Sequence, residues 1–247
     1  MGWNKIERVD NYMFTNKVCV ITGGAKGIGK VIKEEFLKQN AKCYVIDILE
    51  GDHYVGDISN KETLESFVKY VIEKEGKIDF LINNAKPLTK GINNCTYEDF
   101  NYALAVGVTA PFYLSKLFLP YFTENGCIIN ISSSRDRMSQ PQTESYTASK
   151  GGIAALTHAL AVSLAHKVRV NSISPGWINT DESYTGDEED HLQHLSGRIG
   201  KPIDIASLVL FLCSEQASFI NGENICVDGG MTKQMIYHND YNWFLKK

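Results

Sequence analysis

Short runs of β-branched and apolar residues alternate with longer segments of helical period along most of this chain. Such alternation is typical of a parallel sheet whose strands are joined by helices covering both faces. It predicts an α/β fold with a doubly wound parallel sheet of about seven strands. The predicted strands are Val18–Thr22, Lys42–Asp47, His53–Val55, Phe80–Asn83, Cys127–Ile131, Arg169–Ile173 and Asn224–Val227. The predicted helices are Ile28–Gln39, Lys61–Glu75, Tyr97–Thr123, Glu144–Ala165 and Asp204–Cys213, the third with a capping box of Thr96 and Asp99.

Two stretches interrupt the alternation. Only residues 48–52 separate the strand ending at Asp47 from the short strand after it, too few for a crossover helix. We therefore expect a shortened connection between the second and third strands. The acidic, aperiodic stretch Asn179–His194 is expected to form either a lid over a site or a solvated excursion.

Length and charge narrow the class of protein. The 247 residues are 43% hydrophobic and contain no low-complexity linker, which favours one α/β domain with a core over 17–231 and a tail over 232–247. Lys and Arg together number 25 against 29 Asp and Glu, a net charge of -4. This balance argues against nucleic acid or anionic lipid as a partner and favours a small molecule.

Cysteine and histidine usage points to a cytoplasmic protein without a metal. The six cysteines form no C-x-x-C pair and are expected to be reduced core thiols. The first ten residues are charged, and no continuous run of about 18 apolar residues occurs, so secretion and membrane spanning are not expected. His191 and His194 lack a third ligand nearby and are expected to be solvated loop residues.

A glycine-rich turn follows the first strand. Gly23, Gly27 and Gly29 lie between that strand and the first helix, where a tight turn and the helix N-terminus can hold a pyrophosphate. Asp47 ends the next strand, 18 residues after Gly29, where a carboxylate can bind an adenosine ribose and repel a 2′-phosphate. A Rossmann-type site for NAD is therefore favoured, although Lys26 in the turn favours NADP.

A candidate proton-transfer pair lies in SYTASKGG. Tyr146 and Lys150 are four residues apart and share a helix face, so the ammonium is expected to lower the pKa of the phenol. Tyr70 and Lys74 have the same spacing and are interpreted as an exposed helix pair. Ser133 distinguishes the first pair, because it stands thirteen residues before Tyr146 at a strand end, where a hydroxyl can polarise a substrate oxygen.

From Val18 to Met231 the chain resembles the short-chain dehydrogenase/reductase family. The motifs occur in order: TGGAKGIG at Thr22–Gly29, Asp57–Ile58, NNA at Asn83–Ala85, NISS at Asn130–Ser133, YTASK at Tyr146–Lys150, SPGWINT at Ser174–Thr180 and VDGG around Asp228. The resemblance implies that Ser133 orients the substrate oxygen, that Tyr146 is the general acid or base, and that Lys150 also binds the nicotinamide ribose. It further implies a cofactor pocket lined by Ile28, Asp57, Ile58, Asn83, Ala85, Pro175, Gly176, Ile178 and Thr180.

The chain departs from the family pattern at several positions. Gly107 stands where an asparagine usually bends the central helix, so we expect a helix distortion there and a backbone carbonyl with water in place of the amide. Lys86 replaces the glycine after NNA and is either an exposed loop residue or a contact for an anionic substrate group. Arg135 and Arg137 either clamp an anion or, as we favour, form salt bridges with Asp136 or the acidic stretch.

The sequence thus predicts an NAD(H)-dependent oxidoreductase acting on a secondary alcohol or ketone. The alternative is a catalytically impaired NAD(H)-binding sensor or scaffold. The residues between Met231 and Lys247 are rich in Met and aromatic side chains, and with the family pattern they favour a homodimer or homotetramer over a membrane contact.

Overall fold

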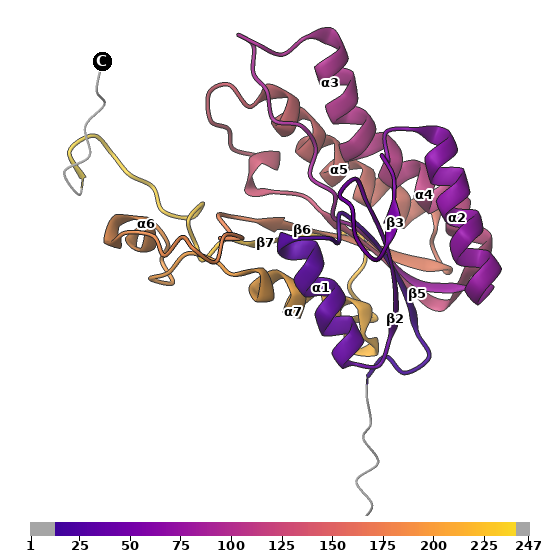
Figure 1. Cartoon of the computed structure of the whole chain (residues 1–247). Helices are drawn as coiled ribbons and strands as arrows, with labels where there is room; N and C mark the ends of the chain where they lie inside the picture. The colour runs from indigo at the N-terminus through magenta and orange to yellow at the C-terminus, as the bar shows by residue number, and fades with distance from the viewer. Residues whose placement is uncertain (1–12, 241–247) are drawn as a thin grey trace, which may run out of the picture.

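A seven-stranded, all-parallel sheet forms the centre of the molecule (Figure 1). The computed structural model describes residues 13–240. Its strands lie in the order β3-β2-β1-β4-β5-β6-β7, which confirms the predicted doubly wound fold. The strands are β1 Val18–Thr22, β2 Lys42–Asp47, β3 Tyr54–Val55, β4 Ile78–Asn83, β5 Phe122–Ile131, β6 Val168–Pro175 and β7 Asn224–Val227.

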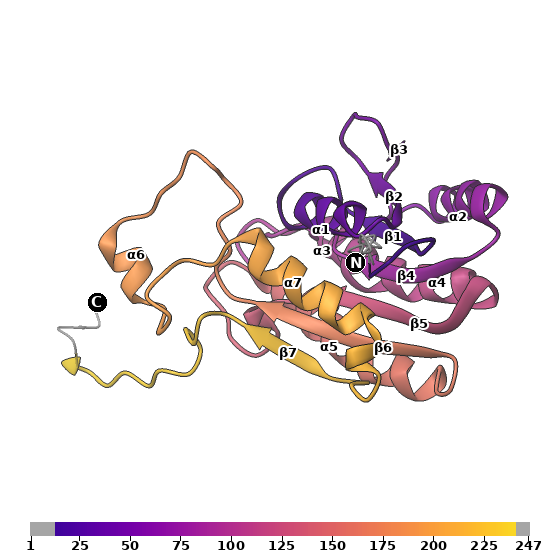
Figure 2. The same cartoon turned by 90° about the horizontal axis from the view of Figure 1, so that it is seen from below.

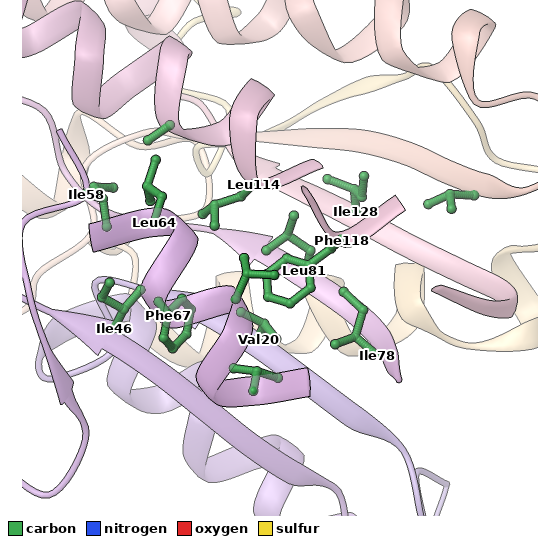
Figure 3. Close-up of a cluster of buried hydrophobic side chains, with 14 of the residues drawn as sticks. Val20, Ile46, Ile58, Leu64, Phe67, Ile78, Leu81, Leu114, Phe118 and Ile128 are labelled. Carbon is green, nitrogen blue, oxygen red and sulfur yellow. The ribbon is translucent and has the colours of Figure 1, made fainter. Parts of the chain in front are cut away.

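Helices cover both faces of the sheet (Figures 1 and 2). One face carries α1 Gly27–Lys38 and α7 Pro202–Cys213, and the other carries α2 Lys61–Glu75, α4 Ala110–Phe118 and α5 Glu144–Ser163. Because each face is covered, the strands are apolar on both sides and two cores form. In the core shown in Figure 3, Phe67 and Phe118 are fully buried against Leu81.

The connection between β2 and β3 is short, as expected. Residues 48–53 form a loop without a helix, closed by a 2.8 Å hydrogen bond between His53 Nε2 and the Leu49 carbonyl. After the two-residue strand, the Gly56 N–H donates to the Asp47 carbonyl. The chain therefore stays beside the end of β2, and the loop borders that end.

The central helix differs from its prediction at its C-terminal end. It begins with α3 Tyr97–Leu104, and the predicted capping box of Thr96 and Asp99 is present. A π-helical turn over Ala105–Thr109 follows, then α4 and a 3-10 turn that ends at Tyr121. The predicted end at Thr123 is wrong, because Phe122 is already extended and pairs with Ile78 of β4.

This helical run is also long and apolar. Over Tyr97–Tyr121 its mean hydropathy reaches 1.4, enough by length and composition to cross a membrane. Of its most apolar 18-residue stretch, 44% is buried inside the protein. A buried helix of a core can have the same length and hydropathy, and α4 packs here on the sheet beside α2.

Candidate active site

A cavity of about 560 Å³ opens at the carboxyl ends of the parallel strands. Ligands of doubly wound sheets bind at this edge, where the strand order reverses between β1 and β4. Two of the residues predicted to form the site, Gly29 and Asn83, do not line the cavity. The predicted residues that do are Gly23, Lys26, Gly27, Ile28, Asp47, Asp57, Ile58, Ala85, Ser133, Tyr146, Lys150, Pro175, Gly176, Ile178 and Thr180.

The glycine turn gives one end of the cavity a backbone wall. Gly23 has φ +68°, and a Cβ there would lie 2.7 Å from the Ala85 Cα. Gly27 has φ +58°, and its Cβ would lie 3.3 Å from Thr180. Side chains would fill this space, whereas glycines leave the N-terminus of α1 open to a phosphate. Gly29 has a packing role instead, since its Cβ would lie 2.2 Å from the Gly23 carbonyl oxygen.

Asp47 is fixed at the end of β2. Its carboxylate accepts hydrogen bonds from the backbone N–H of Ala25 at 2.9 Å and of Leu49 at 3.1 Å. Ile48 and Leu49 also line the cavity, with 62% and 38% of their surfaces exposed. An acceptor beside two apolar side chains suits a ribose next to an adenine, so these residues fit the nucleoside half of a dinucleotide.

Two residues that the sequence did not single out also line this end. Asn84 donates from Nδ2 to the carbonyls of Thr22 and Gly23, which ties the NNA loop to the glycine turn. Tyr102 donates to the Asp57 carboxylate at 3.1 Å; burial and then the charge of Asp57 raise the pKa of this phenol. Nothing in the sequence near Tyr102 signals this contact, which depends on how α3 packs.

Asn83 lies away from the cavity although it belongs to the NNA motif. Its side chain is 5% exposed and donates to the Asn130 amide oxygen at 2.8 Å. The expectation that Asn83 lines the pocket therefore does not hold. Successive side chains of a strand point to opposite faces, so Asn83 at the end of β4 faces inward while its neighbour Asn84 reaches the cavity.

The three predicted catalytic residues meet at the other end of the cavity. Ser133 follows β5 and is 8% exposed, and its Oγ accepts from the Arg135 N–H at 3.2 Å. Tyr146 and Lys150 come from the first turns of α5, with the Lys150 Nζ 5.5 Å from the centroid of the Tyr146 ring. Lys150 is 4% exposed and donates to the Ile131 carbonyl at 2.6 Å.

Burial dominates the proton affinities of this pair. Burial raises the pKa of Tyr146, and the hydrogen bond with Ser133 and the charge of Arg135 only partly oppose it. Burial, followed by the charge of Lys86, lowers the pKa of Lys150 to about 7. The pKa of Tyr146 is thus raised where the Tyr-Lys spacing predicts a lowered one, because the effect of burial exceeds that of the neighbouring groups.

Tyr70 and Lys74 show what the same spacing does elsewhere. Lys74 donates to the Tyr70 hydroxyl at 3.0 Å and lies 4.4 Å from the centroid of its ring. Neither residue lines the cavity. The interpretation as an exposed helix pair is confirmed for Lys74, whereas the Tyr70 ring packs partly against the core.

The π-helical turn places Gly107 directly against α5. This confirms the expected helix distortion at the position where the family usually has asparagine. A Cβ on Gly107 would lie 2.7 Å from the Ser149 Cβ and 3.3 Å from the Pro87 Cβ. The backbone here has no room for a side chain unless the turn between Tyr146 and Lys150 moves.

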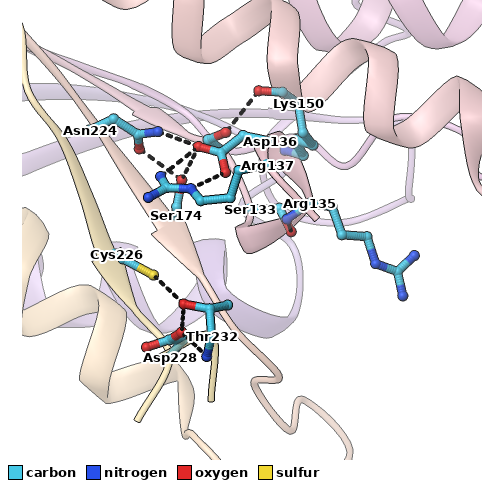
Figure 4. A network of polar contacts seen from close by, with 11 residues as sticks. Ser133, Arg135, Asp136, Arg137, Lys150, Ser174, Asn224, Cys226, Asp228 and Thr232 are labelled. Carbon is cyan, nitrogen blue, oxygen red and sulfur yellow. Dashed lines mark hydrogen bonds and ion pairs between the residues drawn. The ribbon is translucent and has the colours of Figure 1, made fainter. Parts of the chain in front are cut away.

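A buried polar network holds the segment after Ser133 against the sheet (Figure 4). The Asp136 carboxylate accepts hydrogen bonds from Ser174, Asn224 and Arg137, the last through two nitrogens at 2.7 and 2.8 Å. The predicted salt bridge of Arg137 is therefore confirmed. Arg135 forms none within residues 13–240; its guanidinium donates to Gln140 and lies 5.7 Å from the centroid of the Tyr146 ring.

The acidic stretch is only partly aperiodic. It contains the one-turn helix α6 Glu188–Leu192, with a capping box of Asp187 and Asp190. It borders the cavity through Thr180, and Ile178, the residue before the stretch, also lines the cavity. His194 is 2% exposed and packs 6.2 Å from the Trp177 ring, so the expectation that it is solvated is wrong.

The described part of the C-terminal tail extends past α6 in Figures 1 and 2. Its apolar residues Met235, Ile236 and Tyr237 are exposed. Residues 241–247, which complete the predicted interface segment, lie outside the described residues, as do the charged residues 1–10.

Comparisons with known proteins agree with this fold. A family model described as Enoyl-(Acyl carrier protein) reductase matches residues 23–232. An uncharacterized oxidoreductase of Thermotoga maritima is 39% identical, with 91% of this chain and 99% of that protein covered. The 3-oxoacyl-(acyl-carrier-protein) reductase FabG of the same organism is 33% identical, with 87% and 97% covered. Among solved structures, an apo SCOR enzyme from Clostridium thermocellum is 46% identical, with a TM-score of 0.89 and 94% and 100% covered. The chain therefore belongs to the short-chain dehydrogenase/reductase family and is an oxidoreductase of that family.

Proposed function

We propose that this protein interconverts a secondary alcohol and a ketone by NAD(H)-dependent hydride transfer, with Tyr146 as the general acid and base. The observation that carries the proposal is the meeting of Ser133, Tyr146 and Lys150 at one end of a cavity whose other end suits a nucleotide. The family relationship supports the reaction class, and the geometry supports the assignment of these residues.

Each residue of this group has a distinct task. The hydroxyl of Ser133 and the phenol of Tyr146 hold the substrate oxygen, and the phenol gives or takes its proton. The ammonium of Lys150 favours the phenolate when it is charged, and the same side chain would contact the nicotinamide ribose of a bound cofactor. When bound, NAD(H) supplies or accepts the hydride, held by the glycine turn and by residues 175–180.

The preference for NAD over NADP rests on Asp47. Two backbone N–H groups hold its carboxylate in place, so it cannot swing away from an incoming 2′-phosphate without losing both hydrogen bonds. Lys26 also lines the cavity, but its side chain is exposed and no hydrogen bond or ion pair within the described residues holds it at a fixed position. Repulsion from a fixed carboxylate outweighs attraction to an exposed ammonium.

A homodimer or homotetramer is the assembly that we propose. Supporting it are the exposed apolar side chains of the tail, Met235, Ile236 and Tyr237, which contribute no burial in a single chain. Size measurement in solution checks this assembly, and a monomer would contradict it.

The experiment that tests the function is a screen of NADH oxidation over ketones and of NAD reduction over alcohols. We expect turnover of at least one class of substrate, lost in Tyr146→Phe, which keeps the ring and removes only the hydroxyl. Tight NADH binding without turnover on a broad panel would instead support a sensor or scaffold.

A further inference from the structure

Charged residues are distributed unevenly along the cavity. The carboxylates that line it, Asp47 and Asp57, belong to the nucleotide end, where Lys26 also lies. Two basic residues, Lys86 and Lys150, line the catalytic end. Arg135 does not line the cavity itself but lies beside it, with its guanidinium 5.7 Å from the centroid of the Tyr146 ring. Within residues 13–240 none of these three residues forms an ion pair with a carboxylate.

Arg135 differs from its neighbour Arg137 in how its charge is used. Arg137 turns back to the buried Asp136 carboxylate and is neutralised by it, whereas the Arg135 side chain points away from that network (Figure 4). The Arg135 guanidinium lies 5.7 Å from the centroid of the Tyr146 ring, with the neutral side chain of Gln140 as its partner. Its backbone N–H donates to the Ser133 Oγ at 3.2 Å, so the backbone of Arg135 is tied to one catalytic residue and its guanidinium lies near the ring of another.

Lys86 adds a second uncompensated charge on another loop. It follows β4, lines the cavity and is exposed, and it forms no ion pair within the described part of the chain. It is also near enough to Lys150 for its charge to oppose protonation of that lysine. An anion bound between these groups would therefore relieve a repulsion that a neutral molecule leaves in place.

We infer that the substrate carries an anionic group, a carboxylate or a phosphate, within a few bonds of the carbon that exchanges the hydride, and that Arg135 binds this group. The inference rests on the proposed function and names the substrate class for the same site. A guanidinium presents a planar fork that matches carboxylate and phosphate oxygens in bidentate hydrogen bonds. The Lys86 ammonium attracts the same anion as a point charge, without the bidentate hydrogen-bond geometry of a guanidinium.

The test compares alcohols that differ only in charge. The pairs are 3-hydroxybutyrate with its methyl ester, for a carboxylate, and glycerol phosphate with glycerol, for a phosphate. The wild type is measured beside Arg135→Met, which removes the charge, Arg135→Lys, which keeps it without the fork, and Lys69→Gln, a control on the exposed face of α2. The equilibrium affinity of each variant for NADH is measured separately.

We expect the wild type to prefer the anionic member of at least one pair. In Arg135→Met, kcat/KM for that member should fall by about 10- to 100-fold, and for its neutral partner by no more than about threefold. Arg135→Lys should recover part of the loss, and Lys69→Gln should match the wild type. The affinity for NADH should stay unchanged, which also shows that the variants are folded.

Other outcomes would overturn the inference. Turnover that favours the neutral members, or an equal loss for both members in Arg135→Met, would show that Arg135 does not select for charge. A loss of NADH affinity in that variant would assign Arg135 to the cofactor phosphates. If no compound turns over, the proposed function fails, but quenching of bound NADH fluorescence by the same anionic compounds still reports anion binding. Quenching in the wild type that is lost in Arg135→Met would support the inference. No quenching in the wild type would overturn the inference as well.

Discussion

At the scale of single residues, Lys150 shows how burial controls the chemistry of the site. Its ammonium is 4% exposed and bonds one carbonyl, which replaces only part of the hydration of a charged group. Burial and then Lys86 lower its pKa to about 7, against about 10.4 for a lysine in water. Between these values the folded protein carries a neutral Lys150 and the unfolded chain a charged one.

This difference predicts a pH dependence of stability. The unfolded state binds one more proton at Lys150 between about pH 7 and pH 10.4, so this residue makes the free energy of unfolding rise with pH by about 1.4 kcal/mol per unit. Below pH 7 Lys150 is charged in both the folded and the unfolded state, and its buried charge then destabilises the folded protein by the full amount. Denaturant titrations of the wild type and Lys150→Met from pH 6 to pH 9 measure it.

The wild type should gain stability relative to Lys150→Met as the pH rises above 7. Parallel curves for the two proteins would mean that Lys150 keeps an ordinary pKa. Other groups titrate in the same range, but they are common to both proteins and cancel in the difference.

Asp47 and Ile48 lead to a second prediction at this scale. The double change Asp47→Ser and Ile48→Arg removes the carboxylate and adds a cation where a 2′-phosphate would lie. Ile48 is 62% exposed, so an arginine there fits without disturbing the core. The ratio of NADP to NAD affinity should rise by about tenfold or more. Titration of each cofactor measures the ratio, and tighter NADP binding by the wild type would show that Lys26 dominates instead.

At the scale of elements, the π-helical turn over Ala105–Thr109 decides how close the central helix comes to α5. Gly107 lies in this turn and leaves 2.7 Å between its missing Cβ and that of Ser149. The Ser149 Oγ in turn donates to the Tyr146 carbonyl at 2.8 Å. A side chain at 107 would therefore push directly on the turn that positions Tyr146 and Lys150.

Gly107→Ala should consequently lower both stability and turnover. Overpacking of this kind costs about 1–3 kcal/mol in the free energy of unfolding. Gly107→Asn, which restores the usual residue of the family, should be worse, and Ser149→Gly should partly rescue Gly107→Ala. Thermal unfolding and steady-state kinetics provide the comparison. Increased turnover in Gly107→Asn would show that the glycine impairs the site.

Elements with strong local patterns were predictable from the sequence, and those decided by packing were not. The short connection after Asp47 follows from counting residues, and α2 begins and ends where its periodicity predicts. The end of the central helix was missed because Phe122 and Thr123 continue an apolar pattern that suits either helix or strand. Their pairing with β4 and the hydrogen bond from Thr123 to Asp79 decide the outcome, and both are tertiary contacts.

Inside the site, too, local spacing was predictable from the sequence, whereas features that depend on packing were not. Spacing predicted that Ser133, Tyr146 and Lys150 meet, because each lies at a fixed offset from a strand end or along one helix face. The direction of the pKa change at Tyr146 depends on how much water remains around the phenol, which no spacing records. The partner of Arg135 was also missed, since Asp136 is equally near in sequence to both arginines but is taken by Arg137 alone.

At the scale of the whole molecule, the sheet brings residues from distant segments to one edge. The nucleotide end of the cavity comes from the first two strands, and the catalytic end comes from β5 and α5. Cores on both faces hold these strands in register, so the distance between the two ends is set by the fold. The central claim is that this arrangement, more than the Tyr-Lys spacing, makes Tyr146 a proton-transfer group.

The most direct test compares Tyr146→Phe with Tyr70→Phe on one substrate of the wild type. Both tyrosines precede a lysine by four residues, but only Tyr146 lines the cavity. We predict that Tyr146→Phe lowers kcat by about 100- to 10,000-fold with NADH affinity unchanged, whereas Tyr70→Phe leaves kcat at the wild-type value. Turnover by Tyr146→Phe within about tenfold of the wild type would contradict the account.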